Sequence, residues 1–453
     1  MTNNTIPEPA KQAGLVDRWL RGRVEQSLRS LRAGRVTVVD GCERIECGDE
    51  ASDLQATITV NHPRFYRRVA WGADLGAAES LMDGDWQCDD LTALVRILIR
   101  NLPVVSNRKS IVQRLQLAVA RVSQFFRRNT RRGASRNISS HYDLSNEFFE
   151  LFLDDTLSYS CGIFDTEAHT LREASISKID RACQALDLRA SDHLLEIGTG
   201  WGALALHAAQ HYGCRVTTTT ISREQFSRAS QRVRDAGLQD RVTVLDRDYR
   251  DLQGQFDKLV SIEMIEAVGH QYFDTFFRQC SHLLKRDGLM FLQGIVIADH
   301  CYETHIRSVD FINRYIFPGG RLPSVTALMQ SVARSTDMRC LYLEDFAPHY
   351  AETLRHWRRA FLNRLDDVRA LNFDERFIRM WEYYLCYCEA VFEERRVNVV
   401  QMLLAKPDAR KIATPSASVR SRSRQTSESI ETEGRTLERS ATSQSSRATE
   451  SVT

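Results

Sequence analysis

A strand-like run that ends in closely spaced glycines constrains the fold of this chain more than any other segment. In LLEIGTGWGALALHAA, residues 194–209, an apolar run ends at Ile197, a GTGWG turn follows, and a helical pattern then begins. Glycine permits a tight turn between a strand and a helix and lets a ligand approach the backbone closely. The spacing GxGxG differs from the GxGxxG of dinucleotide-binding folds, and no phosphate-binding GxxxxGKS/T motif is present. We therefore expect a different nucleotide-like ligand at this turn, the alternative being a tight turn that binds nothing.

The stretch from residue 142 to residue 406 alternates strand-like and helical segments. Its short apolar runs have the character of buried strands: 193–197, 215–219, 242–245, 258–262 and 289–292. This alternation predicts a doubly wound, Rossmann-like α/β sheet, in which ligands bind at the carboxyl ends of parallel strands. The residues near those ends are the candidates for ligand binding: Glu196, Gly198, Gly200, Gly202, Thr220, Gln225, Asp248 and Tyr249. Together these features resemble a class I S-adenosylmethionine-dependent methyltransferase.

The part before this large domain divides into two predicted units. Residues 1–34 include an amphipathic helical pattern, which favours packing on the next domain, with a membrane-surface helix as the alternative. Residues 35–101 combine two β-like runs, 35–39 and 56–60, with a helical stretch over 63–100. They predict a small α+β accessory domain without catalytic spacing.

Two segments are biased in composition. Residues 102–141 carry nine Lys and Arg residues and no Asp or Glu, interleaved with apolar residues. We interpret them as a basic amphipathic linker, either solvated or in contact with anionic lipid head groups, because basic residues near a membrane surface each contribute about 1 kcal/mol. Residues 407–453 are rich in Ser, Thr, Arg and Glu, so we expect a disordered tail outside the catalytic unit.

Charge and cysteine content exclude several classes of protein. Lys and Arg number 61 against 59 Asp and Glu, so no overall polyanion-binding signal exists, and we expect no nucleic-acid partner. The 11 cysteines include no CxxC pair, which argues against a disulfide scaffold or a zinc module, and we expect no metal. The start has no basic-then-apolar signal region, and no run of about 18 apolar residues exists. We expect a cytoplasmic protein that is peripherally associated with the inner face of the membrane.

Several separated motifs extend the resemblance to one family. They are HYDLSNEFFELFLDDTLSYSCGIF (141–164), MIEAVGHQYFDTFF (264–277), INRYIFPGGRLPS (312–324) and EDFAPHYAETLRHW (344–357). They resemble the cyclopropane-fatty-acyl-phospholipid synthases, a family that includes the mycolic acid cyclopropane synthases. The stretch that begins NHPRFYRRVAWGADLG resembles the accessory domain of the longer bacterial enzymes. The resemblance covers roughly residues 35–405.

This family resemblance implies a fold and a reaction. The fold is a class I methyltransferase fold with a seven-stranded, mostly parallel sheet. In the reaction, a cis double bond of a phospholipid acyl chain attacks the methyl group of S-adenosylmethionine, a carbocation forms, and proton loss closes a cyclopropane. Bicarbonate is the proposed base in the family, so bicarbonate is a possible second ligand. The resemblance also implies contact with a phospholipid membrane surface and a possible homodimer.

The resemblance assigns roles to further residues. Tyr159 and Ser160 hold the cosubstrate together with the glycine turn, while Tyr315 and Phe317 line the acyl channel. The expected catalytic group surrounds the bicarbonate: Cys161, Glu266, Gln293, Ile295 and Tyr350.

One position departs from the family pattern. Where the best-studied members have a histidine near the bicarbonate, this chain has Gln293, which can donate a hydrogen bond but does not titrate near neutral pH. Two alternatives to cyclopropane formation therefore remain: a methyl-branched lipid product, and methylation of a small-molecule amine. A lipid-binding protein without activity is a third hypothesis, against which the intact GTGWG, YSC and IEAVG segments argue.

Overall fold

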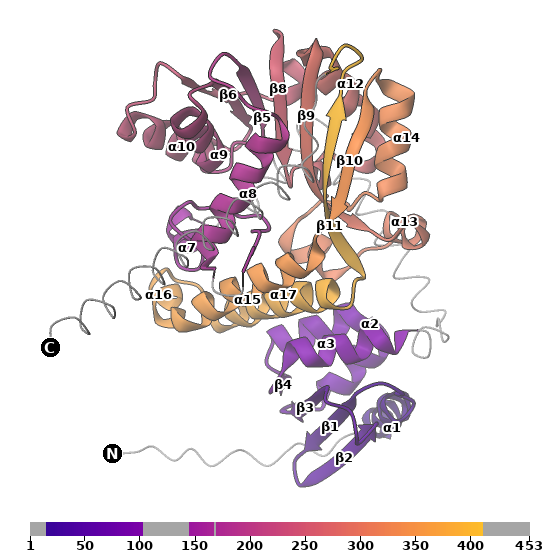
Figure 1. Cartoon of the computed structure of the whole chain (residues 1–453). Helices are drawn as coiled ribbons and strands as arrows, with labels where there is room; N and C mark the ends of the chain where they lie inside the picture. Colours follow the sequence, from indigo (N-terminus) through magenta and orange to yellow (C-terminus); the bar gives the residue numbers. More distant parts are fainter. Residues whose placement is uncertain (1–14, 103–144, 167–168, 411–453) are drawn as a thin grey trace, which may run out of the picture.

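The computed structural model describes residues 15–102, 145–166 and 169–410. The predicted linker 102–141 lies outside these ranges except for its first residue, and the predicted tail 407–453 lies outside them beyond residue 410. Figure 1 shows a large α/β domain with a smaller domain at one end. Among the described residues, no helix combines the length and the apolar character that crossing a membrane requires.

The large domain is built on one seven-stranded sheet with the order β10-β11-β9-β8-β5-β6-β7. Strands β5 to β9 pair in parallel, and β11 runs antiparallel to both of its neighbours. The bounds are His193–Ile197 (β5), Arg215–Thr220 (β6), Val242–Asp246 (β7), Phe256–Ile262 (β8), Leu284–Ile297 (β9), Arg339–Asp345 (β10) and Val397–Ala405 (β11). The predicted seven-stranded, mostly parallel sheet is confirmed.

Helices pack on both faces of this sheet (Figure 1). Alternate residues of β5 belong to different apolar clusters, because Leu194 packs with α8 and α9 while Leu195 packs with α12 and α14. Burial on both faces explains why the strands read as continuous apolar runs. The helices are Asn146–Glu150 (α7), Leu171–Ala185 (α8), Ala203–His207 (α9), Arg223–Asp235 (α10), Ile265–Val268 (α11), Phe273–Leu283 (α12), Asp299–His305 (α13), Val325–Ser335 (α14), Ala347–Asn363 (α15), Leu365–Ala370 (α16) and Glu375–Glu393 (α17).

The small domain joins a four-stranded sheet of order β2-β1-β3-β4 to three helices. Its elements are Leu15–Arg29 (α1), Arg35–Asp40 (β1), Glu43–Gly48 (β2), Gln55–Val60 (β3), Arg64–Met82 (α2), Trp86–Cys88 (β4) and Leu91–Arg100 (α3). The helical stretch expected over 63–100 is therefore interrupted. Gly84, at φ 76°, follows the end of α2, and β4 then pairs with β3. Strand β2 was not predicted from the sequence because half of its residues are charged and most are exposed.

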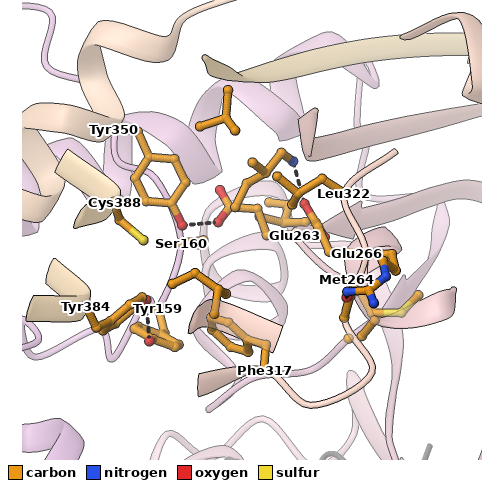
Figure 2. Close-up of a pocket in the computed structure, with 18 of the residues that line it drawn as sticks. Tyr159, Ser160, Glu263, Met264, Glu266, Phe317, Leu322, Tyr350, Tyr384 and Cys388 are labelled. Carbon is orange, nitrogen blue, oxygen red and sulfur yellow. Dashed lines mark hydrogen bonds between the residues drawn. The ribbon is translucent and has the colours of Figure 1, made fainter. Parts of the chain in front are cut away.

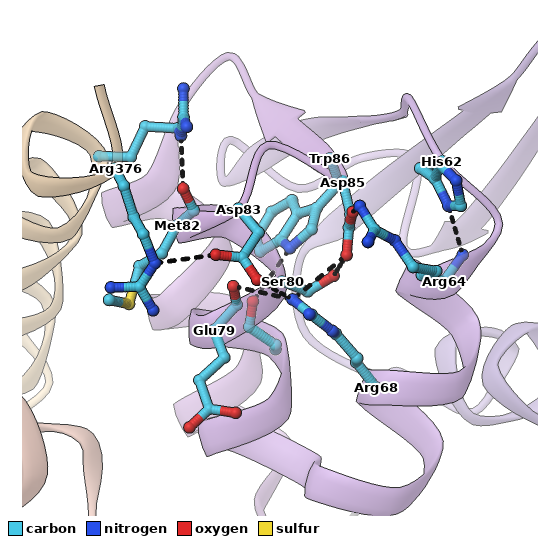
Figure 3. A network of polar contacts seen from close by, with 12 residues as sticks. His62, Arg64, Arg68, Glu79, Ser80, Met82, Asp83, Asp85, Trp86 and Arg376 are labelled. Carbon is cyan, nitrogen blue, oxygen red and sulfur yellow. Dashed lines mark hydrogen bonds and ion pairs between the residues drawn. The ribbon is translucent and has the colours of Figure 1, made fainter. Parts of the chain in front are cut away.

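The small domain contacts the large domain at helix α17. Arg376 Nε donates to Asp83 at 2.9 Å, and Arg379 Nε donates to the backbone oxygen of Met82 at 2.8 Å. Figure 3 shows this contact beside a second network, in which Asp85 accepts from Arg64 and Ser80. The apolar cluster that contains the core of the small domain continues into the aromatic residues of α15 and α17. The small domain can therefore contribute a wall to any cavity that reaches α17.

Candidate active site

A cavity of about 630 Å³ extends from the carboxyl edge of the large sheet to the small domain. Strand β5 lies between β6 and β8, so the turn after Ile197 stands at the switch point where open α/β sheets bind ligands. The predicted cosubstrate residues that line this cavity are Tyr159, Ser160, Glu196, Gly198, Gly200, Thr220, Gln225, Asp248 and Tyr249. The predicted catalytic and channel residues that line it are Glu266, Ile295, Tyr350 and Phe317.

The three glycines of the turn have different functions. All have positive φ angles: 103° at Gly198, 51° at Gly200 and 89° at Gly202. A Cβ atom on Gly200 would meet no atom within 4 Å, so this position is open toward the ligand space. Gly202 does not line the cavity. A Cβ atom there would lie 3.3 Å from the Cβ of Ala229, so Gly202 instead allows close packing on α10.

Glu196 supplies an unpaired acceptor beside the turn. Its carboxylate is buried, and its Oε2 atom has no hydrogen-bond partner. Burial raises the pKa of Glu196 to about 8, against the opposing influence of Thr218 and Lys178. A buried acceptor without a partner is costly unless a ligand supplies the donor. The open glycine turn and this carboxylate fit S-adenosylmethionine, whose ammonium and ribose hydroxyl groups are donors.

Other predicted cosubstrate residues are held by local hydrogen bonds. The Thr220 hydroxyl donates to Gln225 Oε1 at 2.7 Å, which orients the amide and leaves its nitrogen as a donor. Asp248 forms a bidentate pair with Arg250, at 2.8 and 2.6 Å. Asp248 therefore lines the cavity as part of an ion pair rather than as a single carboxylate.

A pair of half-buried glutamates, Glu263 and Glu266, occupies the turn and the short helix α11 that follow β8. Glu263 Oε1 accepts from the backbone nitrogen of Cys161 at 2.9 Å and from Gln293 Nε2 at 2.8 Å. Glu263 Oε2 accepts from the Tyr350 hydroxyl at 2.7 Å, as Figure 2 shows. Glu263 also lines the cavity, and sequence analysis assigned it no role. Its position directly after a buried parallel strand was the signal that could have identified it.

These contacts change the interpretation of the predicted bicarbonate site. The backbone amide of Cys161, the side chain of Gln293 and the hydroxyl of Tyr350 were expected to surround bicarbonate, and all three donate to Glu263. Cys161 and Gln293 are fully buried behind the cavity wall rather than part of its lining. A second anion here would lack these donors and would face the Glu263 carboxylate. The structure therefore does not support the expectation of bound bicarbonate.

The second carboxylate, Glu266, is less well partnered. Its Oε1 atom accepts from the backbone nitrogen of Ile295, and its Oε2 atom has no partner. Burial, together with the neighbouring charge of Glu263, raises the pKa of Glu266 to about 8. Glu266 and Glu263 thus differ in their donors although they share one cavity.

A buried lysine faces this acidic group. Lys178 Nζ donates to Ser160 Oγ at 2.7 Å, and Lys178 lines the cavity. Burial lowers its pKa, while Glu263 raises it. Sequence analysis missed Lys178, because a single lysine in a helical pattern carries no signal of burial.

Aromatic side chains form the wall opposite the carboxylates. The hydroxyl groups of Tyr159 and Tyr384 are 2.8 Å apart, and the Phe317 ring centroid lies 6.4 and 6.2 Å from those of Tyr159 and Tyr384 (Figure 2). Tyr315 does not line the cavity, contrary to the prediction, because its hydroxyl donates to Glu79 of the small domain at 2.7 Å. Residues two apart along a helical turn point in different directions, so Tyr315 and Phe317 separate. Within the described ranges, no group of three or more metal-ligating side chains gathers.

Comparison with known proteins identifies the family. The family model described as mycolic acid cyclopropane synthetase matches residues 129–402. This chain belongs to that family. The tuberculostearic acid methyltransferase of Mycobacterium tuberculosis is 38% identical over 369 residues, which cover 79% of this chain and 85% of that protein. The cyclopropane-fatty-acyl-phospholipid synthase of Escherichia coli K12 is 35% identical over 351 residues, 78% of this chain and 88% of that protein.

Solved structures agree with this assignment. A crystal structure of a mycolic acid cyclopropane synthase complexed with SAH and CTAB matches with a TM-score of 0.57 and 34% identity, over 60% of this chain and 98% of that one. The protein is therefore an S-adenosylmethionine-dependent methyltransferase.

Proposed function

We propose that this member of the mycolic acid cyclopropane synthetase family transfers a methylene group from S-adenosylmethionine to the cis double bond of an unsaturated phospholipid acyl chain, forming a cyclopropane. One observation carries the proposal: a single cavity joins the glycine turn to the acidic pair and then to an apolar arm. S-adenosylmethionine supplies the electrophilic methyl group. The similarity to the E. coli cyclopropane-fatty-acyl-phospholipid synthase supports the same class of acceptor.

The apolar arm suits an acyl chain rather than a small polar amine. Its walls come from both domains, and they include Trp86, Leu94, Val95, Leu98 and Ile99 of the small domain and Tyr383, Tyr387 and Val391 of α17. Mostly apolar, concave sites of this kind bury most of an apolar ligand. Aromatic faces near the carboxylates also stabilise a cation that develops on the chain.

The arm predicts a dependence on acyl-chain length. Leu98 lines the cavity, so Leu98→Trp adds volume where we expect the far part of the acyl chain. We expect about tenfold slower transfer to the longest monounsaturated chains and little change for the shortest. Leu98→Ala should shift the preference in the opposite direction. The measurement compares rates on phospholipids of defined chain length, and equal effects at every length would contradict this placement of the chain.

A second product is favoured by a specific observation. Glu263 and Gln293 form a hydrogen-bonded pair at the site where the family resemblance predicts bicarbonate and a histidine. The similarity to a protein named tuberculostearic acid methyltransferase supports a branched product. In this second candidate the acceptor is unchanged, and the carbocation gives a methyl-branched or methylene-branched chain instead of a ring.

Mass spectrometry of fatty-acid methyl esters from a heterologous host tests the proposal. A cyclopropane product is one CH₂ heavier than a resident monounsaturated acid and does not take up hydrogen under mild hydrogenation. A methylene-branched product has the same mass but takes up hydrogen, and a saturated methyl branch is two hydrogen atoms heavier. A host profile that matches the empty-vector control would contradict acyl-chain methylation.

We also propose peripheral contact with a phospholipid surface. Trp19 of α1 and Trp71 of α2 are 61% and 52% exposed, and amphipathic aromatic side chains favour the membrane interface. The basic segment 102–141, which lies outside the described residues except for its first residue, adds charge of the appropriate sign. We expect flotation with anionic phospholipid vesicles at low salt and weaker flotation after Trp19→Ala with Trp71→Ala. Failure to float at low salt would contradict the proposal.

A further inference from the structure

The proposed reaction requires a group that removes a proton. Once a double bond has taken up a methyl group, the acyl chain carries a positive charge, and a neutral product forms only after a proton leaves. A suitable acceptor must carry a free lone pair, as an ionised carboxylate does, and must reach the cavity beside the cosubstrate site. Among the described residues, Glu263 and Glu266 are the carboxylates of the turn after β8, and both line the cavity.

We propose that Glu263 is the proton acceptor of this enzyme and that the reaction needs no bound bicarbonate. The inference rests on the proposed function, because it concerns the step that follows methyl transfer to the acyl chain. It makes a residue of this chain the base, at the position among Cys161, Gln293 and Tyr350 where the resemblance predicts a separate ion.

Burial raises the pKa of Glu263, and three hydrogen-bond donors oppose that rise because they favour its ionised form. A backbone amide and a glutamine amide nitrogen always donate, and they meet at Glu263 Oε1. The Tyr350 hydroxyl donates to Oε2, and burial keeps the tyrosine protonated by raising its pKa. Hydrogen bonds from three donors stabilise a carboxylate relative to its protonated form. Glu266 accepts only from backbone amides, those of Ile295 and of Glu266 itself, and the charge of Glu263 further raises its pKa, so a proton held by the pair resides on Glu266.

The orientation of the Gln293 side chain is fixed by a hydrogen bond from the neighbouring strand β11. Gln401 of β11 pairs with Gln293 of β9, and Gln401 Nε2 donates to Gln293 Oε1 at 2.9 Å. Because the oxygen of Gln293 is engaged by Gln401, its nitrogen is directed to Glu263. Gln293 therefore acts as a positioning residue, and its inability to titrate suits a permanent donor to a carboxylate.

The backbone at Glu263 is unusual in a way that suits a functional position. Its φ angle is 48°, a left-handed conformation in which a side chain other than glycine, asparagine or aspartate is uncommon. Strained residues of this kind persist where the surroundings hold them, and they concentrate at active sites. Here the hydrogen bond from the Glu263 nitrogen to the backbone oxygen of Gln293, at 2.8 Å, holds the turn.

The chemistry balances without an added oxidant or reductant. The π electrons of the double bond form the new carbon–carbon bond to the methyl group, and the electron pair of the broken carbon–sulfur bond stays on sulfur. Glu263 then takes a proton from the added methyl group. The electron pair of that C–H bond closes the cyclopropane, or, after a 1,2-hydride shift, forms the double bond of a methylene branch. A saturated methyl branch would need a separate hydride donor.

The test compares the full-length enzyme in carbon-dioxide-depleted buffer with and without added bicarbonate. Labelled S-adenosylmethionine and monounsaturated phospholipid vesicles report methyl transfer. We expect the wild-type rate to be the same in both buffers. Glu263→Gln should slow transfer by about 100-fold or more, as the loss of a general base does, while the affinity for S-adenosylmethionine stays within about threefold. A bicarbonate requirement in the wild type, or an unimpaired Glu263→Gln enzyme, would overturn the proposal.

A second variant separates a base from a structural carboxylate. Glu263→Gly places a favoured residue at the left-handed position and leaves a space beside the three donors, so the fold is retained. We expect added formate or bicarbonate to raise the rate of the Glu263→Gly variant by at least about tenfold, because a small anion can replace the missing base. Absence of rescue in a folded variant that binds S-adenosylmethionine overturns the assignment. If the wild type methylates no lipid in either buffer, the proposed function itself has failed.

Discussion

Replacement of Gly200 by asparagine is expected to abolish useful binding of S-adenosylmethionine while the protein stays folded. Gly200 has a φ of 51°, and asparagine is one of the few residues that accept this left-handed conformation. A Cβ atom at this position meets no protein atom within 4 Å, and Gly200 lines the cavity, so the new side chain would project into the cavity. Because the cosubstrate must approach the backbone of the turn, we expect an affinity loss of about 100-fold or more.

Titration calorimetry with S-adenosylmethionine measures this effect, and Gly237 provides a matched control. Gly237 also has a positive φ, 66°, and also has open space where its Cβ would lie, but it follows α10 outside the cavity. Gly237→Asn should therefore bind the cosubstrate as the wild type does. Equal affinities for the two variants would show that Gly200 is not in contact with the cosubstrate.

Replacement of Glu266 by glutamine is expected to slow methyl transfer by about 100-fold, the cost typical of removing one electrostatic stabiliser from an active site. Glu266 lines the cavity, its buried Oε2 atom has no partner, and burial together with the charge of Glu263 raises its pKa to about 8. In its ionised form it stabilises the positive charge that passes from the sulfonium to the acyl chain. Activity of the wild type should therefore rise with pH up to about 8, since the ionised fraction of Glu266 rises.

The pH–rate profile is the decisive measurement for this residue. In Glu266→Gln the rise toward pH 8 should disappear together with most of the activity, because glutamine does not titrate in this range. Glu382→Gln is the control, since it makes the same change on a half-buried carboxyl of α17 outside the cavity. We expect Glu382→Gln to keep the wild-type profile. A Glu266→Gln enzyme with more than a third of the wild-type rate would contradict the assigned role.

The two halves of the site were predicted from sequence to different extents. The cosubstrate half follows from local pattern. Glycines that directly follow a parallel strand lie at the carboxyl edge of the sheet, whatever the fold of the rest of the chain. All the predicted cosubstrate residues except Gly202 line the cavity. Gly202 lies outside the lining, where it packs against α10, because a glycine can serve a ligand or serve helix packing and the motif looks the same in both cases.

The catalytic half depended on contacts between distant segments. Glu263 meets the backbone of residue 161 and the side chains of residues 293 and 350, which come from a loop, from β9 and from α15. These partners are far apart in the sequence. The sequence motifs therefore indicated the partner residues, but they did not show that all three donate hydrogen bonds to one carboxylate. Tyr315 was misplaced for the same reason, since its partner Glu79 belongs to the other domain.

The sequence by itself determined the parallel sheet, the glycine turn and the cosubstrate edge, because strand periodicity and backbone freedom of glycine act over a few residues. Only the tertiary structure decided which acidic side chains are buried together, which donors satisfy them, and that the small domain closes the apolar arm of the cavity. Burial and hydrogen bonding are properties of three-dimensional surroundings, and they set the charge of Glu263, Glu266 and Lys178. The chemistry of the site therefore arises where four separated segments of the chain meet.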